Sequence, residues 1–226
     1  MPVELREGPF TWDKLLDASR IQFQAFHNSA LNKWWRLDDE ISPHAVVQAA
    51  RSLLRSQLEE GRKSVLAEID GEVVGCATWS IPQCRRRNPP FTNAMWRRIY
   101  GYKDGVEEFF NPPKPSVNMQ KIAIFKREQA RMKERNIGNG DEYWYMHTLV
   151  VDPKYQRRGI GAQLLQWALQ KAREDGEKAY VESSPNGEPL YIRNGFREVD
   201  MFRVGGPKLG GGEECTLCCM IYDPFA

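Results

Sequence analysis

Residues 149–162 read LVVDPKYQRRGIGA, and this stretch decides the fold. Its first three residues are apolar and mostly β-branched, as in a buried strand, and Asp152-Pro153 ends the strand. Gly159 and Gly161 follow, and apolar residues then recur at helical spacing as far as residue 172. Glycines let a ligand approach the backbone closely, and the unpaired amides of a helix N-terminus favour an anion. The sequence therefore predicts a strand, a loop and a helix that bind a pyrophosphate; the alternative is an ordinary strand-to-helix turn.

The segments downstream of this loop alternate between strand and helix patterns. Aromatic and β-branched residues predict strands, Asn194-Gly195 closes a short helix, and a run of glycines marks a loop. The predicted strands are 143–151, 178–183, 196–204 and 214–222, the short helix is 188–193, and the glycine-rich loop is 205–212.

The N-terminal part predicts a strand, two helices and a hairpin. Residues 3–7 have a strand pattern, and Thr11 is a candidate N-cap for the first helix. Ser42-Pro43 is a cap followed by a first-turn proline, and it precedes apolar residues at helical spacing. The strands 64–69 and 72–81 are joined by Asp70-Gly71, which supplies the positive φ of a tight turn.

The segment 82–140 differs in composition from the rest of the chain. It contains 13 Lys and Arg against 5 Asp and Glu, so it carries +8 where the remainder carries −6. Two Pro-Pro pairs divide it, and helices are predicted over 94–100 and 117–134. Because acidic residues are interspersed, the basic helix is typical of a solvated face, and we expect an insertion on the domain surface.

Composition narrows the class of protein. The chain has 226 residues, 41% of them hydrophobic, and a formal net charge of +2; this length suits one domain, and this charge argues against a nucleic-acid partner. It lacks a long apolar run and its first residues lack a signal-peptide pattern, so a cytoplasmic or nuclear location is expected. Five cysteines without regular spacing indicate reduced thiols. No metal is expected, because Cys215-x-x-Cys218-Cys219 has no second ligand pair at zinc spacing.

Around the glycine loop the chain resembles the GCN5-related N-acetyltransferases (GNAT). Their acetyl-CoA signature, Gln/Arg-x-x-Gly-x-Gly/Ala after a central strand, is matched by residues 156–161, and 190–196 resembles their Leu-Tyr-x-x-x-Gly-Phe ending. The resemblance covers 64–81 and 142–222 well and 1–60 loosely. It implies an α+β (α/β) GNAT fold, with a mixed, mostly antiparallel central sheet flanked by helices and with its central strands 4 and 5 splayed. The expected organisation is one N-acetyltransferase domain over 1–226 with a basic helical insertion at about 82–140.

The resemblance also implies acetyl-CoA as the cofactor. The strand backbone would pair with the pantetheine arm, and the loop amides would hold the pyrophosphate. The family often has Asn-x-x-Ala where this chain has Ser184-x-x-Gly187, which is a departure in one cofactor contact. The residues implied to bind the cofactor are Leu149, Val150, Val151, Gln156, Arg157, Arg158, Gly159, Ile160, Gly161, Ala162, Ser184, Gly187 and Tyr191.

Three residues are candidates for catalysis. Tyr191 falls where many family members keep a tyrosine that protonates the leaving thiolate; the alternative is a half-buried structural tyrosine. His147 is a candidate base, because family arylalkylamine acetyltransferases have a histidine at this strand position, and period-2 alternation predicts that it shares a face with Leu149. A core histidine is the alternative. Glu182 on the neighbouring strand is the second candidate base, acting directly or through water.

Aromatic residues are the candidates for the acceptor pocket. Those proposed to bind the substrate are Trp34, Trp35, Trp79 and Tyr145, with Trp96 and Trp144 as further wall residues and only one of the adjacent tryptophans facing the site. The function they favour is acetyl transfer to a primary amine of a small metabolite, by direct attack in a ternary complex. The alternatives are a protein or peptide acceptor and a non-catalytic acyl-CoA-binding module. Either a monomer or a homodimer is compatible with the sequence.

Overall fold

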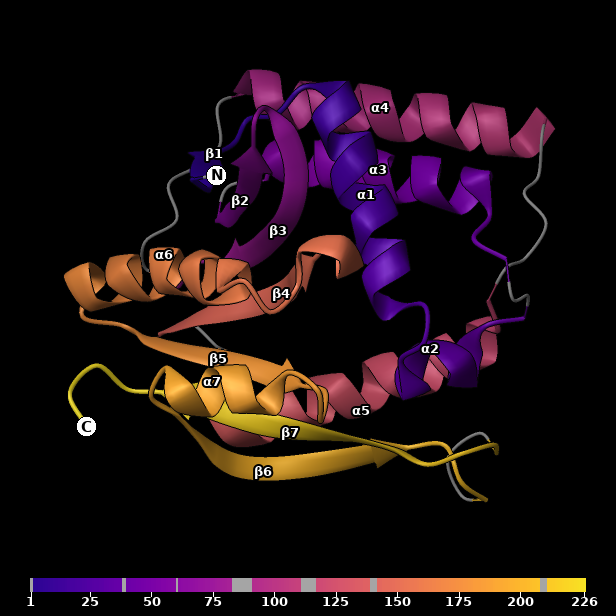
Figure 1. Cartoon of the computed structure of the whole chain (residues 1–226). Helices are drawn as coiled ribbons and strands as arrows, with labels where there is room; N and C mark the ends of the chain where they lie inside the picture. The colour runs from indigo at the N-terminus through magenta and orange to yellow at the C-terminus, as the bar shows by residue number, and fades with distance from the viewer. Residues whose placement is uncertain are drawn as a thin grey trace.

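The computed structural model describes residues 2–37, 40–59, 61–82, 91–110, 117–138, 142–207 and 211–226. A seven-stranded sheet runs through the molecule in the order β1-β2-β3-β4-β5-β7-β6 (Figure 1). Its strands are β1 (Glu4–Glu7), β2 (Arg62–Ile69), β3 (Glu72–Ser80), β4 (Tyr143–Val151), β5 (Lys178–Ser183), β6 (Phe196–Val204) and β7 (Cys215–Tyr222). All neighbouring strands are antiparallel except β4 and β5, which are parallel. The predicted mixed, mostly antiparallel sheet is confirmed.

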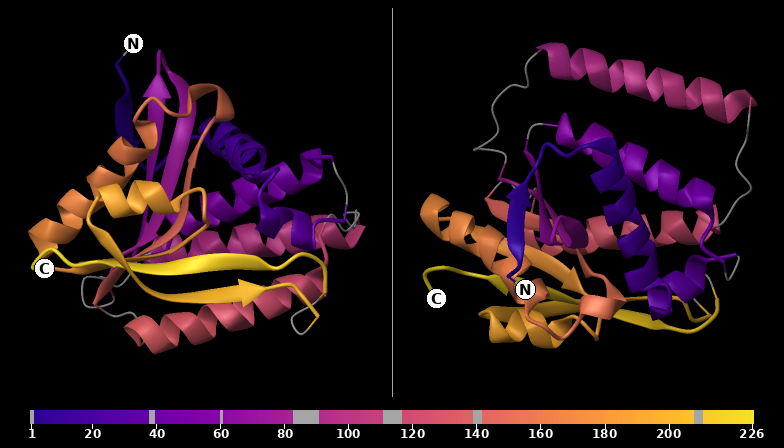
Figure 2. Two further views of the ribbon diagram at one scale, coloured as in Figure 1. Left: turned by 60° about the horizontal axis from the view of Figure 1, so that its bottom comes forward. Right: turned by 45° about the horizontal axis from the view of Figure 1, so that its top comes forward.

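Helices cover both faces of this sheet (Figures 1 and 2). They are α1 (Trp12–Phe26), α2 (Ala30–Trp35), α3 (Pro43–Gln57), α4 (Phe91–Phe110), α5 (Met119–Ile137), α6 (Ile160–Asp175) and α7 (Glu188–Arg193), with a 3₁₀ turn, η2, at Pro153–Tyr155. α6 and α7 pack on one face of the sheet, where Leu164, Leu165 and Tyr191 join the largest buried cluster. α1 and α5 pack on the other face through two further clusters.

Local signals placed several of these elements correctly. Asp70 and Gly71 have φ of 52° and 84°, so the hairpin turn has the positive φ values that its sequence predicts. The Ser42 hydroxyl caps α3 by accepting a hydrogen bond from the Ala45 amide at 3.4 Å, with Pro43 in the first turn. The short α2, capped by Ser29, was not among the predicted helices.

The basic segment is not a surface insertion throughout, because α5 packs on the sheet. Met132 and Ile137 of α5 are buried in a cluster with β6 and β7. The Glu128 carboxylate, also buried, is paired with Arg127 at 3.3 Å and Arg131 at 3.1 Å, whose side chains reach solvent. α5 therefore has one buried face, although its sequence is rich in lysine and arginine.

α4 lies along the outer side of α3 (Figure 2) and is held by charge pairs. Asp104 of α4 pairs with Arg51 at 3.4 Å and also with Arg55. Arg97 of α4 pairs with Glu59 at 2.9 Å, just after α3. This helix extends well beyond the predicted residues 94–100.

Strands β4 and β5 separate after a short pairing. They pair only over Tyr143 with Lys178, Trp144 with Ala179 and Tyr145 with Tyr180. Beyond that point β4 continues beside β3 to Val151, and β5 continues beside β7. The two strands therefore diverge, as Figure 1 shows, and the predicted splay is confirmed. No described strand pairs with residues 147–151 of β4 on the side that faces β5.

Candidate active site

The loop between β4 and α6 presents backbone amides at its surface. Arg157 has a φ of 63° and Gly159 a φ of 80°, and this left-handed conformation turns the chain into the first turn of α6. The N–H groups of that turn have no carbonyl within the helix to bond, and Gly159 offers no capping side chain. A Cβ atom at Gly159 would meet nothing within 4 Å, so the loop surface is open.

The side chains of this loop have different tasks. Gln156 donates from Nε2 to the Val151 carbonyl at 3.0 Å, so it fastens the loop to the end of β4. Arg157 and Arg158 are exposed, and the Arg158 guanidinium lies 5.2 Å from the centre of the Tyr155 ring. Free amides, the positive end of the helix dipole and two arginines are the groups that a pyrophosphate binds, so these residues fit coenzyme A.

The edge of β4 that faces the gap is flanked by apolar side chains. Leu149 and Val151 pack on the α6 side of the sheet, while Val150 packs on the α1 side. Gly161 approaches this edge closely, because a Cβ atom there would lie 3.6 Å from Leu149 Cδ2. The unpaired backbone of β4 and the amides of α6 thus form one continuous polar strip.

Tyr191 lies at the point where the two central strands separate. Its hydroxyl donates to Met146 Sδ of β4 at 3.2 Å, and its ring packs edge-on against Phe196 with centroids 5.5 Å apart. The side chain is buried, and burial raises the pKa of the Tyr191 hydroxyl, so it keeps its proton at neutral and alkaline pH. A thioether is a weak acceptor, which leaves this proton available to a stronger one.

Position 187 is glycine where the family that the chain resembles often has alanine, and the structure gives a steric reason for this departure. A Cβ atom at Gly187 would lie 3.0 Å from Ser183 Oγ and 3.2 Å from Cε2 of Tyr191. Glycine therefore lets α7 sit close to the end of β5. The half-buried Ser184 contributes its carbonyl, which accepts from the Gly187 amide at 2.9 Å and from the Glu188 amide at 3.1 Å.

Glu182 lies across the gap from β4 and is hydrogen-bonded through one oxygen. Its Oε2 accepts from the Tyr145 hydroxyl at 2.7 Å and from Gln129 Nε2 of α5 at 2.9 Å. Its Oε1 is buried, with no hydrogen-bond partner in the described part of the chain. Burial raises the pKa of Glu182, and the hydrogen bonds from Tyr145 and Gln129 oppose that rise. A carboxylate so placed can hold or accept a proton.

His147 lies on a β-bulge, which corrects its predicted orientation. Thr78 pairs with Thr148 and Trp79 pairs with Met146, so His147 is the extra residue of β4 in this register. The extra residue shifts the alternation of β4, and His147 faces α1 and α3 whereas Leu149 faces α6. The prediction that these two residues share a face is wrong, because period 2 does not hold across a bulge.

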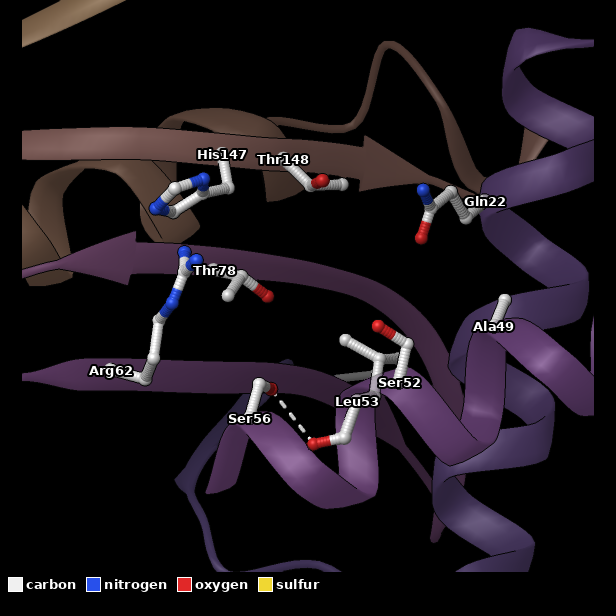
Figure 3. A pocket seen from close by; sticks show the side chains of 9 residues that line it. All are labelled: Gln22, Ala49, Ser52, Leu53, Ser56, Arg62, Thr78, His147 and Thr148. Carbon is white, nitrogen blue, oxygen red and sulfur yellow. Dashed lines mark hydrogen bonds between the residues drawn. The ribbon is translucent and has the colours of Figure 1, made fainter. Parts of the chain in front are cut away.

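A pocket of about 260 Å³ opens beside His147 (Figure 3). It is lined by Gln22, Ala49, Ser52, Leu53, Ser56, Arg62, Thr78, His147 and Thr148, which come from α1, α3 and the strands β2 to β4. His147 Nε2 lies 2.7 Å from Ser80 Oγ, and its ring is perpendicular to that of Tyr145 with centroids 4.6 Å apart. Tyr145 therefore connects His147 to Glu182.

The structure does not bring the predicted tryptophans together at this pocket. Trp79 is fully buried in the cluster under α6, 6.4 Å from the Trp144 ring, so its assignment to the substrate pocket is corrected to the core. Trp34 is 5% exposed and donates to the Gly211 carbonyl at 2.7 Å, and Trp35 packs on Phe125 of α5. Of the four residues predicted to bind the substrate, Tyr145 lies against the His147 ring.

Two remaining predictions concern α4 and the cysteines of β7. Trp96 is 45% exposed on α4 and does not line the pocket. Cys218 faces α6, whereas Cys215 and Cys219 face α5, so the three thiols do not converge on one point.

Sequence reasoning missed Gln129 and Arg62, because nothing in their local sequence shows that α5 and β2 bring them to the site.

Comparison with known proteins finds acetyltransferases. The sequence profile described as "Acetyltransferase (GNAT) domain" matches residues 127–204, which include the second half of α5, the loop between β4 and α6, α6 itself and α7. A relative from Stachybotrys chartarum, named acetyltransferase, is 26% identical over 225 residues, which cover 95% of this chain and 91% of the relative. Over the matched residues the chain is similar to the GNAT acetyltransferases.

Solved structures of N-acetyltransferases share the fold. The polyamine N-acetyltransferase of Drosophila melanogaster aligns with a TM-score of 0.60 at 10% identity, over 97% of this chain and all of that one (100%). The PaiA N-acetyltransferase of Thermoplasma acidophilum, in complex with coenzyme A, aligns with a TM-score of 0.52 at 13% identity, over 99% of each chain. The match to the family profile begins within α5, so the similarity includes the second half of that helix.

Proposed function

We propose that this protein transfers the acetyl group of acetyl-CoA to a primary amine of a small molecule, by direct attack in a ternary complex. One observation carries the proposal. The gap between β4 and β5 has the open amides of α6 at one end and the Tyr191 hydroxyl where the strands part, with Glu182 across it. The groups that bind a thioester donor, and those that move protons during its aminolysis, therefore lie around one opening.

Residues of β4 and the α6 loop would hold the donor. The backbone of Leu149 and Val151 would pair with the pantetheine arm, and the amides of 157–162 would bind the pyrophosphate. Arg157 and Arg158 would add positive charge. The coenzyme A complex of the Thermoplasma relative supports this use of the fold.

Tyr191 and the two candidate bases would handle the protons. Acetyl transfer forms a C–N bond and breaks a C–S bond, so the thiolate gains a proton and the attacking amine loses one. The Tyr191 hydroxyl, whose pKa is raised by burial, would supply the first proton. His147 or Glu182 would accept the second, and the Tyr145 ring and hydroxyl link the two.

The pocket beside His147 supports a small acceptor. It lies between the sheet and the helices α1 and α3, and its volume of about 260 Å³ suits a compact metabolite better than a peptide. The Drosophila neighbour is named for a small amine substrate, which shows that the fold can serve such acceptors. A protein acceptor is the outcome to be excluded by experiment.

Two structural findings bear on where such an enzyme works. The described cysteines Cys76, Cys215, Cys218 and Cys219 are free, although two of them are adjacent, and we propose a reducing compartment such as the cytoplasm. In the described part of the chain, no helix combines the length and apolar character needed to cross a bilayer.

Titration calorimetry with acetyl-CoA, followed by thiol release with small amines and short peptides, tests the proposal. The double variant Arg157→Gln/Arg158→Gln should weaken acetyl-CoA binding about tenfold or more, since each charge-assisted contact contributes about 1.5–3 kcal/mol. Arg20→Gln on α1, an exposed arginine far along the chain from the loop, is the matched control. Absence of acetyl-CoA binding, or turnover with peptides alone, would contradict the proposed function.

A further inference from the structure

The pocket beside His147 contains a guanidinium group, and none of the described residues that line it carries a carboxylate. Arg62 at the start of β2 is the only lysine or arginine among the lining residues, and the others are hydroxyls, an amide, His147 and two apolar side chains. Figure 3 shows the Arg62 side chain reaching from β2 past β3 toward His147.

The positive charge of Arg62 is only partly balanced. Its Nε donates to Glu59 Oε2 at 3.2 Å, but Oε1 of the same carboxylate accepts from Arg97 Nη2 at 2.9 Å. One carboxylate therefore faces two guanidinium groups. In the part of the chain that the structure describes, no residue accepts a hydrogen bond from the terminal nitrogens of Arg62. This arrangement leaves donors and net positive charge at one end of the pocket.

Hydroxyl groups near Arg62 can add further donors. Thr78 Oγ1 accepts from Ser64 Oγ at 3.4 Å, which leaves its own proton free to point into the pocket. Ser52 and Thr148 also line the cavity. Guanidinium and hydroxyl donors around one space are the groups that bind carboxylate and phosphate oxygens.

We propose that the acceptor carries an anionic group as well as its amine, and that Arg62 binds this group. The inference rests on the proposed function and names its substrate class: amino carboxylates, or amines bearing a phosphate, in place of simple alkylamines or diamines. The amine would lie on the β4 side of the pocket, toward Tyr145 and the gap, and the anionic group would lie on the β2 side beside Arg62. The second ammonium group of a diamine would lie beside Arg62 and be repelled.

Matched acceptors test this charge preference. A series of ω-amino acids is compared with alkylamines and diamines of the same chain length, such as γ-aminobutyrate against butylamine and putrescine. Phosphoethanolamine against ethanolamine distinguishes phosphate from carboxylate. Turnover is measured by thiol release, and acceptor binding is measured by calorimetry with coenzyme A present. The best anionic acceptor should exceed its matched alkylamine in kcat/KM by about 10- to 100-fold, as expected for one charge-assisted contact.

Variants of Arg62 identify the group that is responsible. Arg62→Gln should bring the ratio of kcat/KM between the anionic acceptor and its matched alkylamine close to one, while Arg62→Lys should keep part of that preference. Arg97→Gln is the control, because it removes a guanidinium from the same Glu59 without altering the pocket lining. Thermal unfolding of each variant checks that it is folded.

The outcomes separate the two proposals. If acetyl-CoA binds but diamines or alkylamines are the better acceptors and ligands, the inference about Arg62 is overturned and the acetyltransferase proposal stands. If no anionic member binds more tightly than its matched alkylamine, the inference is overturned whether or not turnover occurs. If acetyl-CoA itself does not bind, the proposed function fails first.

Discussion

Replacing by alanine either Gly159, which precedes α6, or Gly161, in the first turn of α6, should have opposite effects on stability. Gly159 has a φ of 80°, a conformation that costs an alanine about 1–2 kcal/mol. Alanine also restricts the unfolded chain, which offsets about 0.4–1 kcal/mol of that cost. We therefore expect Gly159→Ala to destabilise the protein by about 1 kcal/mol.

Gly161 is the matched control, because it lies two residues later in helical conformation. A Cβ atom there would lie 3.5 Å from Leu190 Cδ2 and 3.6 Å from Leu149 Cδ2, which is ordinary van der Waals contact. Alanine is favoured over glycine within a helix by up to about 1 kcal/mol, so Gly161→Ala should stabilise by roughly 0.5–1 kcal/mol. The two variants should differ by about 1.5–2 kcal/mol in the free energy of unfolding.

Urea unfolding and thermal unfolding measure this difference directly. For a chain of this size, about 1.5–2 kcal/mol corresponds to a Tm difference of roughly 3–8 °C. Calorimetry with acetyl-CoA gives a second readout, since only Gly159→Ala should disturb the amides that bind the pyrophosphate. Equal stability of the two variants, or unchanged acetyl-CoA affinity in Gly159→Ala, would refute the reasoning about this loop.

Three further predictions concern the gap itself. Tyr191→Phe removes one hydrogen bond to a weak acceptor, so the free energy of unfolding should change by less than about 1 kcal/mol. The rate of thiol release should fall about 100-fold or more, and unchanged turnover would contradict the role of Tyr191 as the acid. Glu182→Gln should raise Tm at neutral pH, because the raised pKa of Glu182 makes its charged form a destabilising group above that pKa. The increase in Tm should vanish as pH falls toward about 4. A difference in Tm that does not depend on pH would contradict this cause. Gly187→Ala should lower kcat several-fold, because the new Cβ atom displaces Tyr191. Adding Ser183→Ala removes the other close contact of that Cβ atom and should restore part of the lost kcat, which kinetic measurements on the single and double variants would show.

The sequence predicted the parts of the fold that local signals encode. Asp70-Gly71 fixes the hairpin, Ser42-Pro43 starts α3, and the glycines after residue 158 start α6. These signals depend on backbone conformation at single positions, so they can be read without knowing the tertiary structure.

The site depends on features that the sequence does not show. The bulge at His147 arises from the pairing of β3 with β4, so period 2 misplaced that side chain. Trp79 lies under α6 because it shares a face of β3 with Ala77, and its assignment to a pocket did not take that face into account. The many basic residues of α5 made it look like a solvent-exposed helix, so the burial of Met132 was not predicted. The packing of α5 that brings Gln129 to Glu182 was therefore not predicted either.

The short pairing of β4 with β5 also determines how cooperatively the protein unfolds. Strands β1 to β4 form one half-sheet and β5 to β7 another, joined by three residue pairs and covered in common by α6. Amides at such a junction open with lower free energy than those in the centre of a sheet, so the halves are weakly coupled in the free protein. A ligand that hydrogen-bonds along the open edge of β4 and contacts β5 joins them. The bound protein should then exchange its amide hydrogens as a single unit, and the affinity for the donor includes the free energy of that coupling.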